Sequence, residues 1–589
     1  MKLTICGADI SAFVIVLPQM PAPAEKTAAA FLQRVFKSAC GAELAIVSAP
    51  AARSIFIGGS RDLDGIRWDG FRIQTGETHL YLYGRLARGT LYAAYGFAEQ
   101  FLGYRSFAPD TEVIPCGGSA SVPPNFCKTD NPAFELREND WIGHTAFPEF
   151  ASRARTNGNF TAARGEEYGG VITALGGCHT FEGLCPPEQY FADHPEYYSL
   201  WEGERIPAGN VFDRPVGQLC LSNPDVLKIV TENALERLRA NPGAEILDIS
   251  QNDNGRYCRC ETCAAIDAEE GSPSGLLLRF VNAVAEAVER EFPNVLVQTF
   301  AYQYTRKAPR LTRPRKNVVI RYCTIEACFR HALADESCER NAGKFAAELA
   351  EWRAICDKIS IWDYVTNYRY YIAPFPNFEV LRRNACFFAE NHAIHLFEED
   401  TPGTWSGEFG DLKAYLIGKL LWDPYMSEEA YQTHIDEFLQ AYYGPGWEHI
   451  RRYLRLEADA TRGRHMGCFE YMDTGSMCEG EVAAGDYEPQ AYQEPYPDSY
   501  LSGLIERIGE AKALWDGALA AAASDAQRMH VERSRLPLTY LDLFCTPHDR
   551  EAMSAEARAA YEAAVEKYHA DKRRFGFHTN IWTQRYRGR

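Results

Sequence analysis

The sequence has no excess of basic residues, and this absence excludes two classes of partner. Its 589 residues contain 61 Lys and Arg against 80 Asp and Glu, which gives a formal charge of -19. Nucleic acids and anionic membrane surfaces attract proteins through a basic face. We therefore expect neither a nucleic-acid nor a membrane partner, and a neutral or cationic ligand suits this charge better.

Long hydrophobic runs are also missing. The first apolar run, Phe13 to Leu17, is short, follows Asp9, and is not followed by a small-residue cleavage site. A membrane helix needs roughly 20 apolar residues, and a secretion signal needs a basic start and a cleavage site. We expect a cytoplasmic protein, or an exported one if a signal peptide preceded this sequence. The 18 cysteines are widely spread and are expected to be mostly reduced, buried thiols.

The composition is that of a folded, soluble protein with a surplus of aromatic residues. Hydrophobic residues make up 46% and charged residues 24% of the chain, which excludes disorder over most of its length. Aromatic residues reach 13%. Such rings fill cores, and they also provide flat platforms for ligands such as sugars.

Three regions can be distinguished along the chain. Residues 1–118 alternate short strands with two helical patterns, 24–39 and 89–101, and predict a small two-layer α+β domain. A Pro-, Gly- and Ser-rich joint follows. Residues 426–589 lack strand patterns and predict a helical C-terminal region.

The middle region, residues 130–425, carries the strongest fold signal. Buried strand patterns such as 246–250, 295–301 and 318–322 alternate with helical segments such as 276–290. About eight such units predict a parallel (β/α)8 barrel of the TIM type. A doubly wound open sheet is the alternative, but no Gly-rich dinucleotide turn follows any of these strands.

Polar and acidic residues recur where these strands end. A (β/α)8 barrel builds its active site at the carboxyl ends of its strands. The strand-end runs are Arg137–Asp140, Gly177–His179, Gln251–Asn254, Tyr302–Tyr304, Thr324–Glu326, Asp363–Tyr364 and Glu398–Asp400. A single acid at such a place can be a helix cap or part of a salt bridge, whereas four acids around one barrel mouth favour chemistry.

The chemistry that best fits paired carboxyl groups and aromatic rings is glycoside hydrolysis. One carboxyl group donates a proton and another stabilises an oxocarbenium-like centre. Strand-end rings such as Tyr302, Trp362 and Trp405 suit sugar stacking. In an alternative arrangement the acetamide of the substrate is the nucleophile. Adjacent residues such as Asn252 and Asp253 could then polarise it and donate the proton.

Three cysteines in six residues, Cys258, Cys260 and Cys263, raise the question of a metal. A zinc site needs four ligands, and the sequence offers no clear fourth partner, so structural thiols or a disulfide knot are favoured over zinc. No carboxylate/His cluster has ligand spacing either. The sequence therefore predicts no metal and no cofactor, and activity that survives chelators.

Several multi-residue motifs, in order, make the chain recognisable. They are His194–Tyr197, Gln218–Pro224, Ser250–Cys263, Glu270–Gly275, Phe280–Asn282, Ala301–Thr305, Tyr322–Glu326, Ile361–Tyr364 and Tyr442–Pro445. It resembles glycoside hydrolase family 163, a formerly uncharacterised bacterial domain family of endo-β-N-acetylglucosaminidases that act on complex N-glycans. The resemblance covers about residues 136–453, and the front region is similar to the N-terminal domain of α-glucuronidases. The chain departs from the family at Glu398–Asp400, where the family keeps the first acid and follows it with an amide and Gly.

The resemblance implies a retaining mechanism assisted by the 2-acetamido group of the substrate. Asp253 would donate the proton and Asn252 would orient or polarise the acetamide. Glu326 and Glu398 would hold hydroxyls or stabilise charge, and Asp363 and Tyr364 would contact the acetamide or the ring. The full set of candidate substrate-binding residues is His144, His179, Tyr302, Tyr304, Trp362, Asp363, Tyr364 and Trp405.

Other functions stay open at this stage. A different glycosidase on the same scaffold, α-glucuronidase-like or an exo-hexosaminidase, is one alternative. A uronate substrate would want a cation at a strand end, where Arg137 and Arg321 are available. A sugar-binding protein without turnover is the other alternative. The sequence does not predict the linkage that is cleaved or the oligomeric state.

Overall fold

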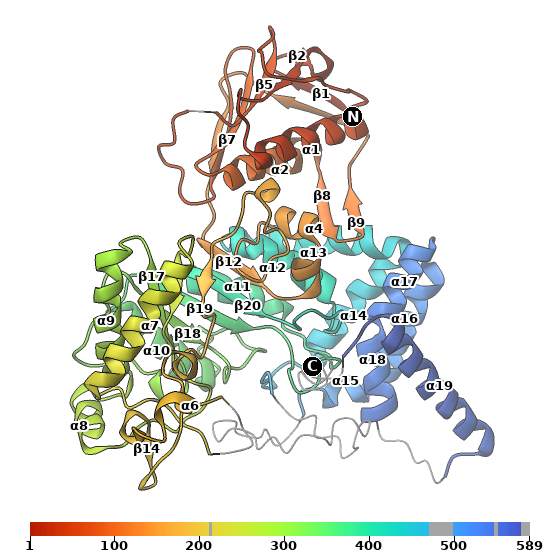
Figure 1. Ribbon diagram of the computed structural model, residues 1–589. Coiled ribbons are helices and arrows are strands. Elements are labelled where there is room, and N and C mark those ends of the chain that lie inside the picture. The colour runs from red at the N-terminus through yellow and green to blue at the C-terminus, as the bar shows by residue number, and fades with distance from the viewer. Residues whose placement is uncertain (60, 211–214, 470–498, 547–551, 579–589) are drawn as a thin grey trace.

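The computed structural model describes residues 1–59, 61–210, 215–469, 499–546 and 552–578. Figure 1 shows an N-terminal region at the top, a barrel below it and a group of C-terminal helices to one side. Among the described residues, no helix combines the length and the apolar character needed to cross a bilayer.

The N-terminal region is a sheet covered by two helices, as the sequence predicts. Helices α1 (Pro23–Cys40) and α2 (Ala87–Leu102) pack on each other, and α2 packs on the sheet. The six-stranded sheet has the order β11-β6-β7-β5-β3-β4, and a three-stranded sheet, β10-β1-β2, lies beside it. The strands are β1 (Lys2–Ile5), β2 (Ala8–Asp9), β3 (Val14–Val16), β4 (Ile46–Val47), β5 (Ser54–Ile57), β6 (Phe71–Thr75), β7 (Leu80–Gly84), β10 (Ser119–Val122) and β11 (Cys127–Asp130), and a hairpin of β8 (Arg105–Ala108) and β9 (Thr111–Val113) follows α2.

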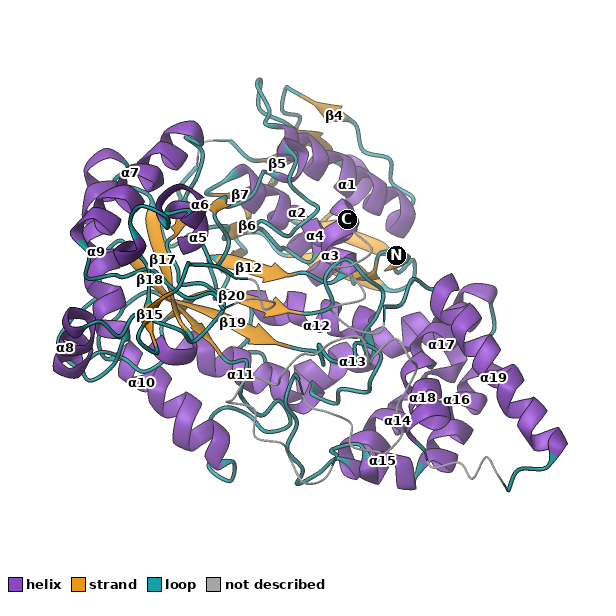
Figure 2. Ribbon diagram, turned by 60° about the horizontal axis from the view of Figure 1, so that its bottom comes forward, coloured by secondary structure: helices purple, strands orange, loops and turns teal. Residues whose placement is uncertain are grey.

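The middle region is a parallel α/β barrel, which confirms the predicted fold class. Its strands pair in the order β12-β20-β19-β18-β17-β16-β13, and every pair is parallel. Figure 2 shows helices around the outside of these strands. The strands are β12 (Leu136–Asn139), β13 (Ala174–Leu175), β16 (Ile246–Asp248), β17 (Leu296–Ala301), β18 (Val318–Cys323), β19 (Ile359–Tyr364) and β20 (Ala393–Glu399). The helices are α3 (Ile142–Ala146), α4 (Pro148–Arg153), α5 (Phe181–Leu184), α6 (Pro187–Tyr190), α7 (Pro224–Ala240), α8 (Glu261–Glu270), α9 (Ser274–Glu291), α10 (Ala347–Arg353), α11 (Phe378–Glu390) and α12 (Gly410–Trp422). A small hairpin of β14 (Leu200–Trp201) and β15 (Glu204–Arg205) lies before α7.

The sheet has seven strands where the sequence suggested about eight, because an irregular segment bridges its two edges. Asn157 pairs with β12, since its side chain accepts the Arg137 N–H at 2.8 Å and its own N–H bonds the Arg137 carbonyl. Asn159 pairs with β13, where its side chain bonds the carbonyl and N–H of Ala174 at 2.6 and 3.3 Å. Gly158 between them is needed because a Cβ there would lie 2.1 Å from Glu138 Oε1. Two carboxamides thus substitute for one strand.

A buried ion-pair network joins the N-terminal region to the barrel. Asp69 is 1% exposed and binds two guanidinium groups, Arg88 at 2.8 Å and Arg137 of β12 at 2.5 Å. Asn157 donates to the same carboxylate at 2.8 Å. The two cations hold the pKa of Asp69 below its ordinary value despite burial. Arg137 is therefore committed to this interface.

The C-terminal region is helical in its described residues. Helix α13 (Glu428–Tyr443) packs against α12 of the barrel, and α14 packs against α16. Figure 1 shows this group of helices alongside the barrel. The remaining helices are α14 (Trp447–Ala460), α15 (Ser502–Glu506), α16 (Ile508–Ala521), α17 (Asp525–Ser534), α18 (Leu536–Tyr540) and α19 (Ala555–Arg574).

Candidate active site

Side chains alternate between the interior of the barrel and its helix-covered outside, and this alternation sorts the strand-end acids. Ile361 and Leu396 belong to the core that the strands share with the helices, whereas Trp362 and Phe397 contact each other on the opposite face at 5.1 Å. Successive residues of a strand point to opposite faces. Asp363 therefore points to the same outer face as Ile361, and Glu398 to the same outer face as Leu396. Glu399 points to the inner face, like Phe397.

Arg321 identifies the interior face. It lies on β18, yet its guanidinium donates to the carbonyl of Gly177, just beyond β13, at 3.4 Å. Strand order separates β18 from β13 by two strands, so the side chain crosses the interior. The same guanidinium lies 5.3 Å from the ring of Trp362 and bonds Ser360 Oγ at 3.2 Å. The interior thus holds a cation under an aromatic ring.

Glu399 stands at the mouth of this interior. The indole N–H of Trp362 donates to Glu399 Oε2 at 2.7 Å, and both side chains are half-buried. Asp140, after β12, is buried, and its pKa is raised well above the ordinary value, first by burial and then by the charge of Glu399. Glu399 is therefore an accessible carboxylate beside a buried acid of raised pKa on the neighbouring strand.

Asp253 is the second accessible strand-end acid. The hydroxyl of Tyr302 donates to Asp253 Oδ1 at 3.0 Å, and the Gln303 amide approaches the same oxygen at 3.4 Å. His179 lies beside them, its ring 6.1 Å from Tyr302, with Nδ1 2.7 Å from the carbonyl of Gln251. Burial is the main cause that raises the pKa of Cys178, and the charges of Glu399 and Asp253 add to it, so both carboxylates lie in the surroundings of this thiol.

Glu398 and Asp363 lie outside the interior, which disagrees with the predicted role of Glu398 in the site and with the predicted substrate contact of Asp363. They are paired across β20 and β19, and both are buried. Burial, and then the charge of Asp363, raises the pKa of Glu398 well above its ordinary value, and burial raises the pKa of Asp363 to about 6. Thr324 donates to Asp363 at 2.5 Å. These acids are packed between the strands and the surrounding helices, where a sugar does not reach.

The side chain of Asn252 is also hydrogen-bonded within the protein. Its side chain accepts the Glu182 N–H at 3.1 Å and donates to the Gly217 carbonyl at 3.0 Å, and the residue is fully buried. Both ends of the amide are therefore used to hold the loop. This arrangement does not favour the predicted contact with a substrate acetamide, and Asn252 is better described as a residue that positions Asp253.

Glu326 takes part in a buried ion pair. Its Oε1 lies 2.7 Å from Arg306, which also bonds Glu348 at 2.6 Å, and Glu326 is 4% exposed. The other oxygen, Oε2, is buried without a hydrogen-bond partner. The carboxylate is thus largely used to fix the loop after β18.

The remaining predicted contacts are divided between the mouth and other packing. His179, Tyr302 and Trp362 lie at the mouth, as described above. His144 is fully buried against α12, 3.3 Å from the Ala414 carbonyl, and burial lowers its pKa to about 4. Trp405 packs on Trp141 and beneath Arg533 of α17. Two tyrosines pack on other side chains: Tyr304 is stacked on Tyr257 at 4.6 Å, and Tyr364 is buried beside Phe329.

Sequence reasoning did not assign a site role to Glu399, Asp140 or Phe160. Phe160 is 43% exposed and is stacked on Phe397 of the interior face at 4.9 Å, so it offers an aromatic ring to a ligand. The two residues before the acids, Leu396 and Phe397, are apolar on opposite faces of β20, and the period therefore does not distinguish Glu398 from Glu399. The sequence identified the acids of the Glu398–Asp400 run as candidates, but it did not show which of their side chains point into the barrel.

The predicted cysteine cluster has the fourth sulfur that the sequence did not reveal. Cys220 lies 3.8 Å from both Cys260 and Cys263, measured between sulfur atoms. All four sulfurs, including that of Cys258, lie within 4.8 Å of one another. The cysteines among the described residues are free thiols rather than a disulfide knot. The expectation that no fourth partner exists was therefore wrong.

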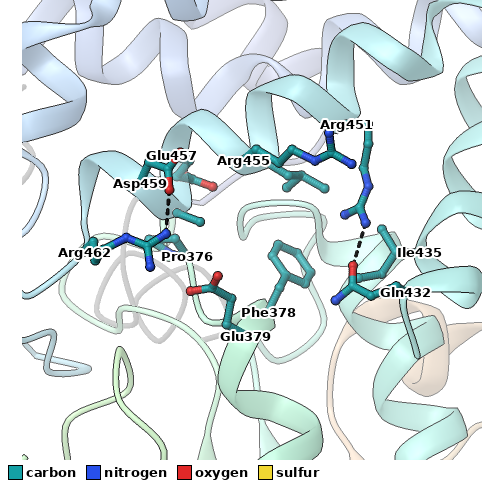
Figure 3. A pocket seen from close by; sticks show the side chains of 12 residues that line it. Pro376, Phe378, Glu379, Gln432, Ile435, Arg451, Arg455, Glu457, Asp459 and Arg462 are labelled. Carbon is teal, nitrogen blue, oxygen red and sulfur yellow. Dashed lines mark hydrogen bonds and ion pairs between the residues drawn. The ribbon is translucent and has the colours of Figure 1, made fainter. Parts of the chain in front are cut away.

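A separate pocket of about 330 Å³ lies among α11, α13 and α14, away from the strand-end acids described above (Figure 3). Two of its arginines already have partners: Arg451 donates to Gln432 at 2.5 Å and Arg462 to Asp459 at 2.6 Å. Its exposed acids are also paired, Glu379 with Arg330 at 2.8 Å and Asp459 with Arg462.

The fold and the arrangement of the mouth define a chain of the (β/α)-barrel class with an N-terminal α+β region. The family described as "Domain of unknown function (DUF4838)" matches residues 106–455, and the chain belongs to that family. No curated protein matches the sequence.

Solved structures agree with this fold. A family GH115 4-O-methyl-α-glucuronidase with specificity for decorated arabinogalactans is 12% identical, with a TM-score of 0.56 over 96% of this chain and 76% of that one. A GH138 enzyme targeting pectin rhamnogalacturonan II is 11% identical, with a TM-score of 0.43 over 96% and 74%. The GH20 β-N-acetylhexosaminidase from Streptomyces coelicolor A3(2) is 12% identical, with a TM-score of 0.40 over 73% and 91%. At these identities the first similarity establishes the fold, and the other two carry no further argument.

Proposed function

We propose that this protein is a glycoside hydrolase that binds its carbohydrate substrate at the carboxyl ends of the barrel strands. The observation that carries the proposal is a pair of half-buried acids, Asp253 and Glu399, at one mouth lined by aromatic rings. Paired carboxyl groups are the usual requirement of glycoside hydrolysis, and active sites of this barrel class lie at this end. The GH115 relative of similar fold is named as a glycosidase, which supports the class.

We further propose endo-β-N-acetylglucosaminidase activity, because the motifs around Asp253 resemble glycoside hydrolase family 163. In this mechanism the substrate acetamide oxygen attacks the anomeric carbon while the bond to the leaving oxygen breaks. Asp253 gives its proton to that oxygen, and then takes one from the water that opens the cyclic intermediate. Glu399 accepts the acetamide N–H and so strengthens the attacking oxygen.

Three neighbouring side chains hold these acids in place for their roles. Tyr302 and Gln303 hold the Asp253 carboxyl group in one orientation, and the Trp362 indole holds Glu399. A fixed geometry lowers the entropy cost of reaching the transition state. Complex N-glycans are the proposed substrates, with Phe160 and Trp362 as stacking surfaces.

A uronic acid substrate is the second candidate, and Arg321 is the observation that favours it. Arg321 lies inside the barrel under Trp362, where it could bind a uronate carboxylate. Arg137, the other cation that the sequence offered, is excluded from this role by its buried pairing with Asp69. The GH115 relative of similar fold is named as an α-glucuronidase.

One experiment separates these functions. The full chain is incubated with a glycoprotein that carries complex N-glycans, and in parallel with 4-O-methylglucuronate-decorated arabinogalactan, and the released sugars are analysed by mass. Oligosaccharides with a reducing-end GlcNAc support the endo activity, whereas free uronic acid supports the second candidate. Release of single N-acetylhexosamines would mean an exo enzyme. Binding without any release over long incubation would contradict the proposal of a hydrolase.

A further inference from the structure

Two clusters of metal-ligating side chains lie outside the acids described above. The first consists of Cys220, Cys258, Cys260 and Cys263, and the second of Cys328, His331, Cys338 and His465. In each cluster, one ligand atom from every residue lies within 4.8 Å of the other three. Sets of four cysteines, or of two cysteines and two histidines, are the common ligands of structural zinc in proteins.

The geometry of the cysteine cluster fits a tetrahedral ion. A Zn–S distance of about 2.3 Å places tetrahedral sulfur atoms roughly 3.8 Å apart, and Cys220 lies 3.8 Å from both Cys260 and Cys263. A disulfide would need sulfurs about 2.05 Å apart. The cluster has the spacing of ligands around a common centre rather than of bonded pairs.

Groups around the sulfurs are suited to negative charge. The Leu200 N–H points to Cys258 Sγ at 3.4 Å, and Arg205 approaches the same sulfur at 3.7 Å. Ser222 Oγ lies 3.1 Å from Cys263 Sγ. Such outer contacts are typical of metal-bound cysteines, because they share the charge of the thiolates.

The second cluster joins two parts of the chain that are far apart in sequence. Cys328 Sγ lies 3.3 Å from His331 Nδ1, and Cys338 Sγ lies 3.7 Å from His465 Nδ1. Tetrahedral zinc with one sulfur and one nitrogen ligand gives a separation of roughly 3.6 Å. His465 follows α14, whereas the other three residues follow β18. A bound ion would therefore tie the C-terminal region to the barrel.

We infer that this protein holds two structural zinc ions, one in each cluster. Each ion would brace a loop at the carboxyl end of a strand. Cys258 follows Asp253 in the loop after β16, and Cys328 follows Glu326 in the loop after β18. A backbone hydrogen bond next to the second cluster joins the same two segments, since the Phe329 N–H donates to the Met466 carbonyl at 2.8 Å. Neither ion takes part in the proposed hydrolysis.

The test is the metal content of the full chain, expressed without a metal-binding tag in zinc-supplemented medium. Elemental analysis should give two zinc ions per chain that resist gel filtration in EDTA. Mercurial titration of the thiols should release both into a chromophoric zinc indicator. Cobalt replacement should give thiolate-to-metal charge-transfer bands in the near ultraviolet. These readouts do not depend on activity or on any variant.

Matched variants assign each ion to its cluster. Cys260→Ser, at the half-exposed ligand of the first cluster, and His331→Gln in the second should each remove one zinc ion per chain. Cys386→Ser, a half-buried cysteine of α11 outside both clusters, should retain two. A wild-type chain with no zinc, with iron in its place, or with disulfides among these cysteines would overturn the inference. One ion per chain, lost only in Cys260→Ser, would overturn the second site.

Discussion

The inner and outer faces of β19 and β20 carry acids that are neighbours in sequence but differ in environment. Glu399 is half-buried, receives the Trp362 indole N–H, and faces the mouth. Glu398 is buried among Asp363 and Asp400 on the helix side, and this burial keeps it protonated well above its ordinary pKa. The comparison teaches that an acid at a strand end is a candidate for chemistry only when its side chain points into the barrel.

The largest expected loss of activity follows substitution of Asp253, the accessible acid on the side of the mouth opposite Glu399. Asp253→Asn keeps the size and the bond from Tyr302 but removes the proton, so we expect a loss on the order of 10³-fold in kcat on a natural glycan. An activated aryl glycoside, which needs less protonation, should lose much less. Steady-state rates on both substrates measure this. Near-normal glycan turnover would transfer the donor role to another acid, and circular dichroism checks that the variant is folded.

Glu399 and Glu398 provide the sharpest pair for testing the two faces. Glu399→Ala should reduce kcat/KM about 10²-fold, because it removes a group that acts in the transition state. Glu399→Gln should lose less, since its carbonyl still accepts the acetamide N–H. Glu398→Gln imitates the protonated acid and should stay close to wild type. A large loss in Glu398→Gln with a normal fold would contradict the division into faces.

The smallest effect concerns stability on the outer face. Burial raises the pKa of Asp400 to about 6, above an ordinary value near 4 in the unfolded chain. The folded protein therefore binds more protons, so this stabilisation is full at low pH and is lost as the pH rises through about 6. Asp400→Asn should be more stable than wild type at pH 8 and lose that advantage below pH 4. Urea unfolding across this range measures it, and equal pH profiles would refute the shift.

The barrel was predictable because its strands and helices have distinct periods and lengths. The strand 295–301 and the helix 276–290, for example, were expected close to β17 and α9. Asp253 was also a candidate, since the polar run 251–254 ends a buried strand, and its role stays a prediction. The sequence could not reveal which side chains of a strand point into the barrel. Leu396 and Phe397 are both apolar, so nothing in the pattern shows which face is the interior.

The sequence also did not predict contacts between segments that are far apart along the chain. Cys220 meets Cys258–Cys263 from a position about forty residues earlier, and His465 meets Cys338 across more than a hundred. The missing strand had a similar cause, because the carboxamides of Asn157 and Asn159 bond two edges that are separate in sequence. Local patterns report local structure, whereas these groups depend on the closed fold.

The carboxamide bridge at Asn157 and Asn159 also decides where the barrel can open. Elsewhere a continuous ladder of backbone hydrogen bonds must break in concert, but here two backbone bonds of Asn157 and a few side-chain bonds span the gap between β12 and β13. Amide hydrogens along residues 155–160 should therefore exchange with solvent before those of β17 to β19. The segment that closes the barrel therefore lies next to Glu138 and Phe160, on the side where the substrate is proposed to bind.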